Sequence, residues 1–195
     1  PGWNAILEEP KNYTDSSEPK DLRHEAFAFG KKARATGKRS FAHGNKVEAS
    51  GNTAYAIGQE NKTTGSASFT GGYQNTNNGT YSFNFGSSNT ISNKINNGVI
   101  FGNENTLDVD TEPSRNSASA IGYQLTNTKG PDGKLVIGHK NAEKLNTYFE
   151  VGAGDIDRNW NAFEVYFDGR AKAYGVPTEN NDVIRYQELE EVKSN

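Results

Sequence analysis

Bulky and small side chains alternate between residues 24 and 93, and the alternation returns every fourteen residues. Written in lines of fourteen, this stretch reads HEAFAFGKKARATG, KRSFAHGNKVEASG, NTAYAIGQENKTTG, SASFTGGYQNTNNG and TYSFNFGSSNTISN. Glycine occupies the seventh column of all five lines and the fourteenth column of the first four. A fixed period of this length predicts a solenoid, in which each repeat forms one coil stacked on the last.

The third to seventh columns predict a strand with two different faces. The third and fifth columns are mostly Ala, Ser or Thr, whereas the fourth and sixth are mostly aromatic. Because successive side chains of a strand point to opposite sides, this period of two separates a small face from a bulky face. The bulky residues are Phe27, Phe29, Phe41, His43, Tyr55, Ile57, Phe69, Phe83 and Phe85.

The second half of each line predicts another short strand. Its tenth and twelfth columns hold small residues or Asn, and the ninth, eleventh and thirteenth hold mainly charged and hydroxyl side chains. Each coil should therefore place the small residues of its two strands face to face. We expect an interior too narrow for side chains much larger than alanine, with glycines at the corners where φ can be positive.

The bulky face cannot enter so narrow an interior. A row of Phe and Tyr along the whole length of a soluble rod requires a cover. The simplest cover is a second and third copy of the chain, because three rolls around one axis would bury all three rows. We therefore predict an oligomer whose interface consists of the nine bulky residues named above.

The pattern small-x-Ala-x-Gly, repeated with a fixed spacing, resembles the head repeats of YadA-like trimeric adhesins and related domains of bacteriophage tail fibres. TAYAIG at residues 53–58 and SASAIG at residues 117–122 are the strands most similar to that family. The resemblance covers roughly residues 24–138 and implies an all-β fold, namely a left-handed parallel β-roll in an intertwined homotrimer. This chain uses Phe and Tyr where the family usually has Val and Ile.

The repeats define the expected domains. Residues 1–23 do not share the period and are expected to form an N-terminal cap or linker. The β-roll repeats should span residues 24–140, with longer spacings between glycines after Gly86. The extra residues predict loops near 108–115 and 128–133, which are either partner-binding insertions or solvated corners.

A different pattern begins at residue 141. We expect a small β-hairpin module over residues 141–177, with strands at 149–151 and 162–167 and a turn at Asp168-Gly169. This segment resembles a module that follows such repeats in phage tail fibres. Residues 178–195 show apolar positions at roughly helical spacing, which predicts a neck at the start of a coiled coil.

Composition narrows the classes of protein. Of the 195 residues, 32% are hydrophobic and 21 are glycine, which disfavours a compact α/β enzyme. Disorder, the simplest alternative for so polar a chain, does not account for a period of fourteen. A net charge of −3 gives no reason to expect nucleic acid, and the absence of cysteine excludes thiolate chemistry and disulfides. No apolar run is long enough to predict membrane insertion of this fragment.

Two sequence features are candidates for ion binding. Residues 155–159 copy the first three ligands of a calcium loop, but Trp160 and Tyr166 stand where Gly and Glu are required. A polar hairpin is therefore the preferred interpretation. Three copies of His43 could meet at a trimer axis and hold an anion or a metal, although we expect this ring to pack as a Phe would. We predict no cofactor and no metal site.

No nucleophile with a base, and no pair of acids, is concentrated where an active site would need them, so we expect no enzyme. The favoured function is a trimeric tail-fibre or receptor-binding segment of a virion, which attaches to a host cell-surface glycan or protein. Candidate surface-binding residues are Tyr73, Tyr123 and Trp160. The alternative is the head of a trimeric autotransporter adhesin on a bacterial surface. A third possibility is a tailspike whose enzymatic groove lies elsewhere.

Overall fold

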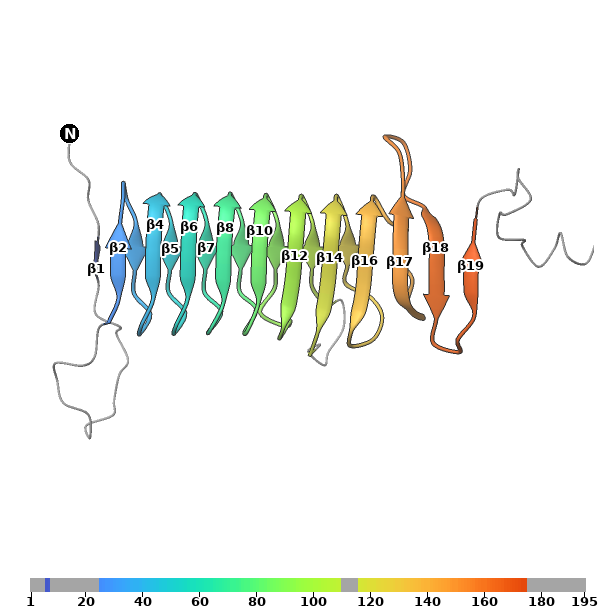
Figure 1. The fold of residues 1–195 in the computed structure, drawn as a ribbon, viewed down its shortest axis with the longest axis horizontal. Coiled ribbons are helices and arrows are strands. Elements are labelled where there is room, and N and C mark those ends of the chain that lie inside the picture. The colour runs from blue at the N-terminus through green and yellow to red at the C-terminus, as the bar shows by residue number, and fades with distance from the viewer. Residues whose placement is uncertain (1–5, 8–24, 110–115, 175–195) are drawn as a thin grey trace, which may run out of the picture.

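The chain folds into a rod of stacked coils. A computed structural model describes residues 6–7, 25–109 and 116–174, and all of the regular elements in these ranges are strands. The coils form a parallel β-solenoid of about nine turns with roughly 14 residues per turn, and they follow one another along the rod in sequence order (Figure 1). The predicted all-β solenoid is therefore confirmed.

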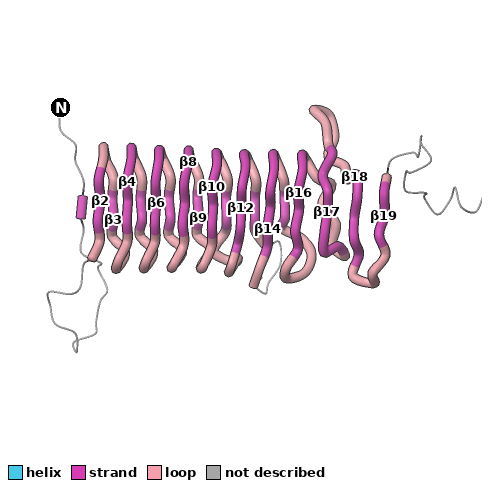
Figure 2. Tube along the Cα trace, viewed as in Figure 1, coloured by secondary structure: helices cyan, strands magenta, loops and turns pink. Residues whose placement is uncertain are grey.

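The coils as far as β15 contribute one strand to each of two sheets, and loops connect the strands (Figure 2). The 11-stranded sheet contains β2 (Phe27–Phe29), β4 (Phe41–Asn45), β6 (Tyr55–Gln59), β8 (Phe69–Tyr73), β10 (Phe83–Ser87), β12 (Gly98–Asn103), β14 (Ala118–Tyr123), β16 (Lys134–His139), β17 (Thr147–Ala153), β18 (Asn161–Tyr166) and β19 (Ala171–Ala173). The 8-stranded sheet contains β1 (Ile6–Leu7), β3 (Arg34–Ala35), β5 (Glu48–Ala49), β7 (Lys62–Thr63), β9 (Thr76–Asn77), β11 (Thr90–Ile91), β13 (Thr106–Leu107) and β15 (Thr126–Asn127).

The strands pair in register by column. Phe41 pairs with Tyr55, and Tyr55 pairs with Phe69, so identical columns lie side by side from coil to coil. All pairings from β2 to β17 along the larger sheet are parallel. A slip of one residue would turn every small side chain outward and every aromatic one inward, which the interior could not accommodate.

The interior differs between the two halves of the rod. In the first coils it is filled by buried alanines such as Ala35, Ala42 and Ala56, as expected. The expectation that nothing much larger than alanine would fit is wrong: buried asparagines already exceed it in the early coils, and in the later coils Ile95 and Leu107 are fully buried. These coils contain more than fourteen residues, and the extra length widens the interior.

An asparagine ladder lines the corner beside the seventh column. The side-chain oxygen of Asn61 accepts a hydrogen bond from the backbone N–H of Asn75 at 2.9 Å, and Asn75 does the same for Asn89 at 2.9 Å. The amide nitrogen of Asn75 donates to the carbonyl of Gly86 at 2.8 Å. Each buried amide therefore satisfies polar groups of the next coil, as stacked Asn side chains do in other parallel β structures.

The glycine columns let the backbones of neighbouring coils approach closely. Gly44 has φ of +139°, and a Cβ added there would lie 1.8 Å from the carbonyl oxygen of Gly58. The fourteenth column meets the same constraint without a positive φ, since a Cβ at Gly51 would lie 2.2 Å from the oxygen of Gly65. Glycine is required in both columns because no side chain fits between the coils.

Glycine is not the only residue with a positive φ at the corners. Lys46, in the ninth column, has φ of 55°, and Thr53, in the second column, also has φ of 55°. Equivalent residues of other coils repeat these angles. Sequence patterns based on glycine alone did not reveal these left-handed positions, because stacking of the coils holds side chains there at a cost of about 1–2 kcal/mol each.

The rod ends in antiparallel strands. β17 still pairs in parallel with β16, whereas β18 and β19 pair antiparallel, with Asp168 and Gly169 in the turn between them. The segment predicted as a separate module is thus continuous with the larger sheet. The predicted neck at 178–195 and most of the N-terminal segment 1–23 lie outside the described residues. The described part of the chain has no helix that could span a membrane.

We expect Gly44→Ala to lower the free energy of unfolding by about 3 kcal/mol or more, because the methyl group would clash with the next coil at a strained φ. The matched control is Gly169→Ala, which also has a positive φ, +83°, but has nothing within 4 Å of its added Cβ. That variant should lose only about 1–2 kcal/mol. Urea unfolding followed by circular dichroism measures both, and equal losses would contradict the stacking argument.

Candidate functional site

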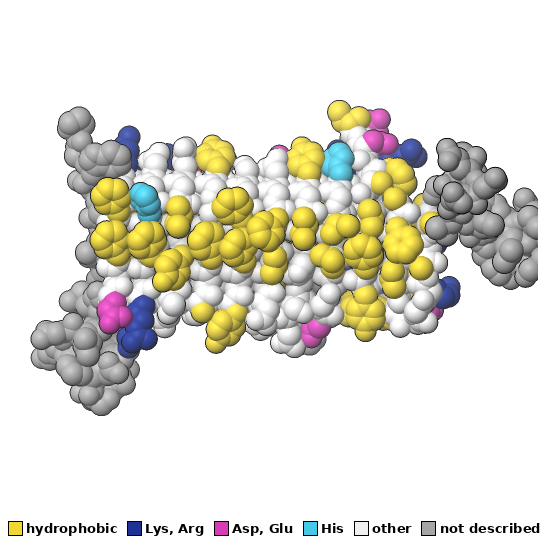
Figure 3. Space-filling view, viewed as in Figure 1, with side chains coloured by type: hydrophobic (Ala, Val, Ile, Leu, Met, Phe, Trp, Pro, Cys, Tyr) yellow, Lys and Arg dark blue, Asp and Glu magenta, His cyan; other side chains and the backbone are white. Residues whose placement is uncertain are grey.

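The most prominent surface feature is the outward face of the larger sheet. We define the aromatic stripe as the fourth and sixth columns of β2 to β14, counted from the glycine of the seventh column. Figure 3 shows a continuous band of hydrophobic side chains along the rod. Its members are Phe27, Phe29, Phe41, His43, Tyr55, Ile57, Phe69, Gly71, Phe83, Phe85, Val99, Phe101, Ser119 and Ile121.

The structure brings the nine predicted interface residues into this one stripe. Several remain half exposed in the single chain, including Phe29 at 58%, Phe27 at 55% and Phe85 at 47%. Their own coils cannot cover them, since small side chains already fill the interior. An apolar band of this length on a single chain is typical of a surface that another molecule covers.

Within the stripe the rings stack from coil to coil. The ring centroids of Phe69 and Phe83 are 5.0 Å apart, as are those of Phe83 and Phe101. Gly71 interrupts the sixth column, but a Cβ there would lie 2.8 Å from the ring of Phe85. The neighbouring ring therefore occupies the space beside this glycine, and the apolar surface remains continuous.

Sequence reasoning missed the last part of the stripe. Phe101 and Ile121 directly precede Gly102 and Gly122, as Phe85 precedes Gly86, and both are exposed. The sequence predicts coils up to residue 140, including the strand at 117–122, but the interface was assigned only as far as Phe85, where the period of fourteen ends. Counting the sixth column back from Gly102 and Gly122 identifies both residues.

The candidate surface-binding residues lie outside the stripe. Tyr73 and Tyr123 each directly follow the glycine of the seventh column, and they belong to the same row of paired residues across the sheet. Because β10 and β12 lie between their strands, they are about 14 Å apart at the usual strand spacing. Tyr123 stacks on His139 with ring centroids 5.0 Å apart. Trp160 lies in the loop between β17 and β18. The three predicted residues are 37–42% exposed, and the structure does not gather them into one pocket.

The calcium-like sequence forms a capped turn. One carboxylate oxygen of Asp155 accepts hydrogen bonds from the backbone N–H groups of Asp157 at 3.0 Å and Arg158 at 3.1 Å, and the other contacts the Arg158 guanidinium at 3.2 Å. The hydrogen bond from Asp157 is the main reason that the pKa of Asp155 lies below its usual range. Within the described ranges, no group of three or more His, Cys, Asp or Glu could hold a metal ion.

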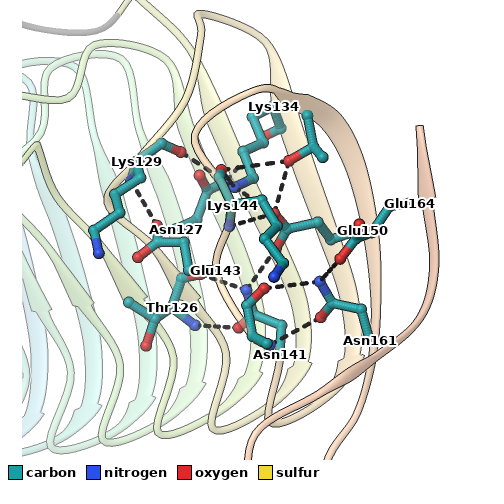
Figure 4. A network of polar contacts seen from close by, with 12 residues as sticks. Thr126, Asn127, Lys129, Lys134, Asn141, Glu143, Lys144, Glu150, Asn161 and Glu164 are labelled. Atoms are coloured by element: carbon teal, nitrogen blue, oxygen red, sulfur yellow. Dashed lines mark hydrogen bonds and ion pairs between the residues drawn. The ribbon is translucent and has the colours of Figure 1, made fainter. Parts of the chain in front are cut away.

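A network of buried charges occupies the end of the rod (Figure 4). Lys134 and Glu150 are both fully buried, and their charged atoms are 2.7 Å apart. The Lys134 ammonium also donates to the carbonyl of Lys144 at 2.7 Å. Glu150 further accepts hydrogen bonds from Thr147 at 2.7 Å and from Asn141 at 2.8 Å. This pairing offsets the cost of removing the two charges from water.

A second buried carboxylate, Glu164, lies on β18 directly opposite Glu150. Burial alone would raise the pKa of Glu164, but hydrogen bonds from Tyr166, Tyr174 and Asn161 outweigh it and hold this pKa below the usual range. Burial and the bond to Glu164 raise the pKa of Tyr174. Since both carboxylates are enclosed and hydrogen-bonded, they join the final strands rather than present a reactive group to solvent.

The sequence contained a signal for this network. Counted from their glycines, Lys134 stands in the third column and Glu150 in the fifth, both of which hold small inward-facing residues in the early coils. A charged residue at an inward position requires a buried partner. The opposite charges in adjacent coils were therefore a recognisable pair, although the second carboxylate, Glu164 of β18, was not.

The comparisons with known proteins leave the family open. No protein-family model matches the chain, and no curated protein has significant sequence similarity to it. The fold and the stripe define a class, a parallel β-solenoid with one exposed aromatic face.

We expect Glu164→Gln to destabilise the protein by about 2 kcal/mol at neutral pH, because the charged acceptor of three hydrogen bonds is lost. Because the pKa of Glu164 is lowered in the folded state, its ionised carboxylate contributes fully to the free energy of unfolding above the ordinary pKa of 4.5. This contribution is lost as the pH falls below that value. The difference in free energy of unfolding between the variant and the wild type should therefore become smaller in acid. Urea unfolding from about pH 7 to about pH 3.5 measures it.

The control for this prediction is Glu48→Gln, on the outward side of β5 in the smaller sheet. It should change the free energy of unfolding by less than about 0.5 kcal/mol. If the difference in free energy of unfolding between Glu164→Gln and wild type became larger in acid, it would contradict the role of Glu164 as an ionised hydrogen-bond acceptor.

Proposed function

We propose that this chain is a segment of a homotrimeric fibre, in which three left-handed β-rolls bury their aromatic stripes against one another. The observation that carries this proposal is a continuous apolar stripe outside a solenoid whose interior is already full. Each fully buried aromatic side chain contributes about 1.5–3 kcal/mol, so a row of them provides ample energy for association.

A second and third copy are the partners that fit this stripe best. The stripe repeats at the coil spacing, and a copy of the same chain offers the same repeat, so rings can interdigitate along the whole rod. The stripe is also narrow, only two columns wide, which suits a thin core on a threefold axis. The resemblance to YadA-like heads supports three copies, the left-handed roll and a helical neck after it.

We further propose that the trimer attaches a bacteriophage virion to a host surface. A rod with three identical faces presents each weak contact three times, which raises the overall affinity without any new contact. Tyr73, Tyr123 and Trp160 stay outside the stripe and remain free to contact a host glycan or protein. The tail-fibre-like segment after residue 140 favours this function over the alternative, the head of a bacterial trimeric autotransporter adhesin.

We expect light scattering after size exclusion to give about 64 kDa, three times the 21.3 kDa of one chain. Phe85→Glu should reduce this mass to that of a monomer, because a carboxylate would be buried in an apolar interface. The control, Tyr81→Glu, changes an exposed side chain of the second column and should remain trimeric. A folded wild-type monomer would refute the trimer.

We expect the double variant Tyr73→Ala/Tyr123→Ala to reduce retention of the trimer on host cells by about tenfold or more, because three copies of each contact are lost. Labelled trimer is applied to bacterial cells and, separately, to mammalian extracellular matrix. Retention on bacteria supports a virion fibre, and retention only on the matrix supports an adhesin. Tyr81→Ala is the matched control, and equal retention of all variants would exclude this edge of the rod as the binding surface.

A further inference from the structure

His43 is the one ionisable side chain of the sixth column within the stripe. It lies on β4 between Phe29 of β2 and Ile57 of β6, which pair with it in register. Its ring centroid lies 5.2 Å from that of Phe29 and 6.3 Å from that of Phe41. In the single chain the imidazole is exposed to water.

The strands packed against β4 offer the imidazole no opposite charge. On the stripe side, β2 presents Phe27 and Phe29, and β6 presents Ile57 and the neutral phenol of Tyr55. In β2 to β14 as described, the fourth and sixth columns contain no Asp, Glu, Lys or Arg. A proton on His43 would therefore have no carboxylate within the stripe to compensate it.

The charged pairs of these coils belong to other columns. Arg39 contacts Glu25 at 2.9 Å in the second column, and Lys46 contacts Glu60 at 3.0 Å in the ninth. Hydrogen bonds from Gln74 and Lys46 hold the pKa of Glu60 below its usual range. Both pairs are already formed within one chain.

We propose that His43 makes assembly of the fibre dependent on pH: the trimer forms with neutral imidazoles and is weakened when they are protonated. This inference rests on the proposed trimer. Histidine is the side chain whose charge ordinarily changes between pH 5 and 8, and transfer of a charge from water into an apolar interface is unfavourable. The assembled state then binds fewer protons than the free chains, so assembly is strongest at high pH and weakens as the pH falls.

Threefold symmetry multiplies the effect. If burial disfavours the protonated form by about tenfold at each His43, three copies lower the association constant by about a thousandfold. The opposite sign is expected if three imidazolium groups instead bind an anion on the axis, because protonation would then strengthen assembly. The direction of the pH dependence therefore discriminates between the two arrangements.

The test measures the mass of the full chain against concentration at about pH 8 and about pH 5, a window above the acid range in which Glu164 titrates. Wild type, His43→Phe and the control His139→Phe are compared, because phenyl rings already occupy the sixth column at Phe29 and Phe85 while His139 lies outside the stripe. The expected result is a wild-type trimer that dissociates at the lower pH, with midpoint concentration raised at least about tenfold. His43→Phe should stay trimeric and His139→Phe should follow wild type.

The other outcomes overturn the inference in distinguishable ways. A wild-type trimer of equal stability at both pH values, or one stabilised in acid, refutes the role of His43 and leaves the trimer intact. Equal dissociation of wild type and His43→Phe assigns the pH dependence to another group. A monomer at pH 8 refutes the proposed trimer and this inference together.

Discussion

The close stacking of backbones at the glycine columns governs the rest of this structure. Gly44 and Gly58 leave no space for a Cβ between coils, so each coil lies directly on the next in a fixed register. That register aligns every column along the rod, which creates the asparagine ladder inside and the ring stacks outside. The interior of the early coils holds alanines such as Ala42 and Ala56 together with the buried asparagines of the ladder.

Bulky residues are outside the solenoid because the inside is closed to them. The stripe therefore results from the narrow interior of the coils rather than from the amino-acid composition alone. The later coils show the converse: where extra residues lengthen a coil, Ile95 and Leu107 are enclosed and the interior becomes an ordinary apolar core. The chain therefore has hydrophobic side chains in two places: buried inside the long coils and exposed on the stripe.

The end of the solenoid is organised by charge rather than by apolar packing. Lys134 and Glu150 occupy inward columns of adjacent strands, and Glu164 joins them from the first antiparallel strand. Such groups are stable inside a protein only when their hydrogen-bonding capacity is met, which requires strands from both sides of the transition. The network therefore links the parallel coils to the hairpin.

The sequence by itself determined the period, the two faces of each strand and the row of residues from Phe27 to Phe85 that forms the stripe. These features are local, since glycine, small and bulky side chains repeat at fixed offsets whatever the distant contacts are. Only the tertiary structure decided the left-handed φ at residues such as Lys46, the wide interior around Ile95 and the partners of Lys134. The left-handed φ recurs every fourteen residues but follows from how the coils stack, which the side-chain pattern does not show. The other two features depend on contacts between residues whose spacing is irregular in the sequence.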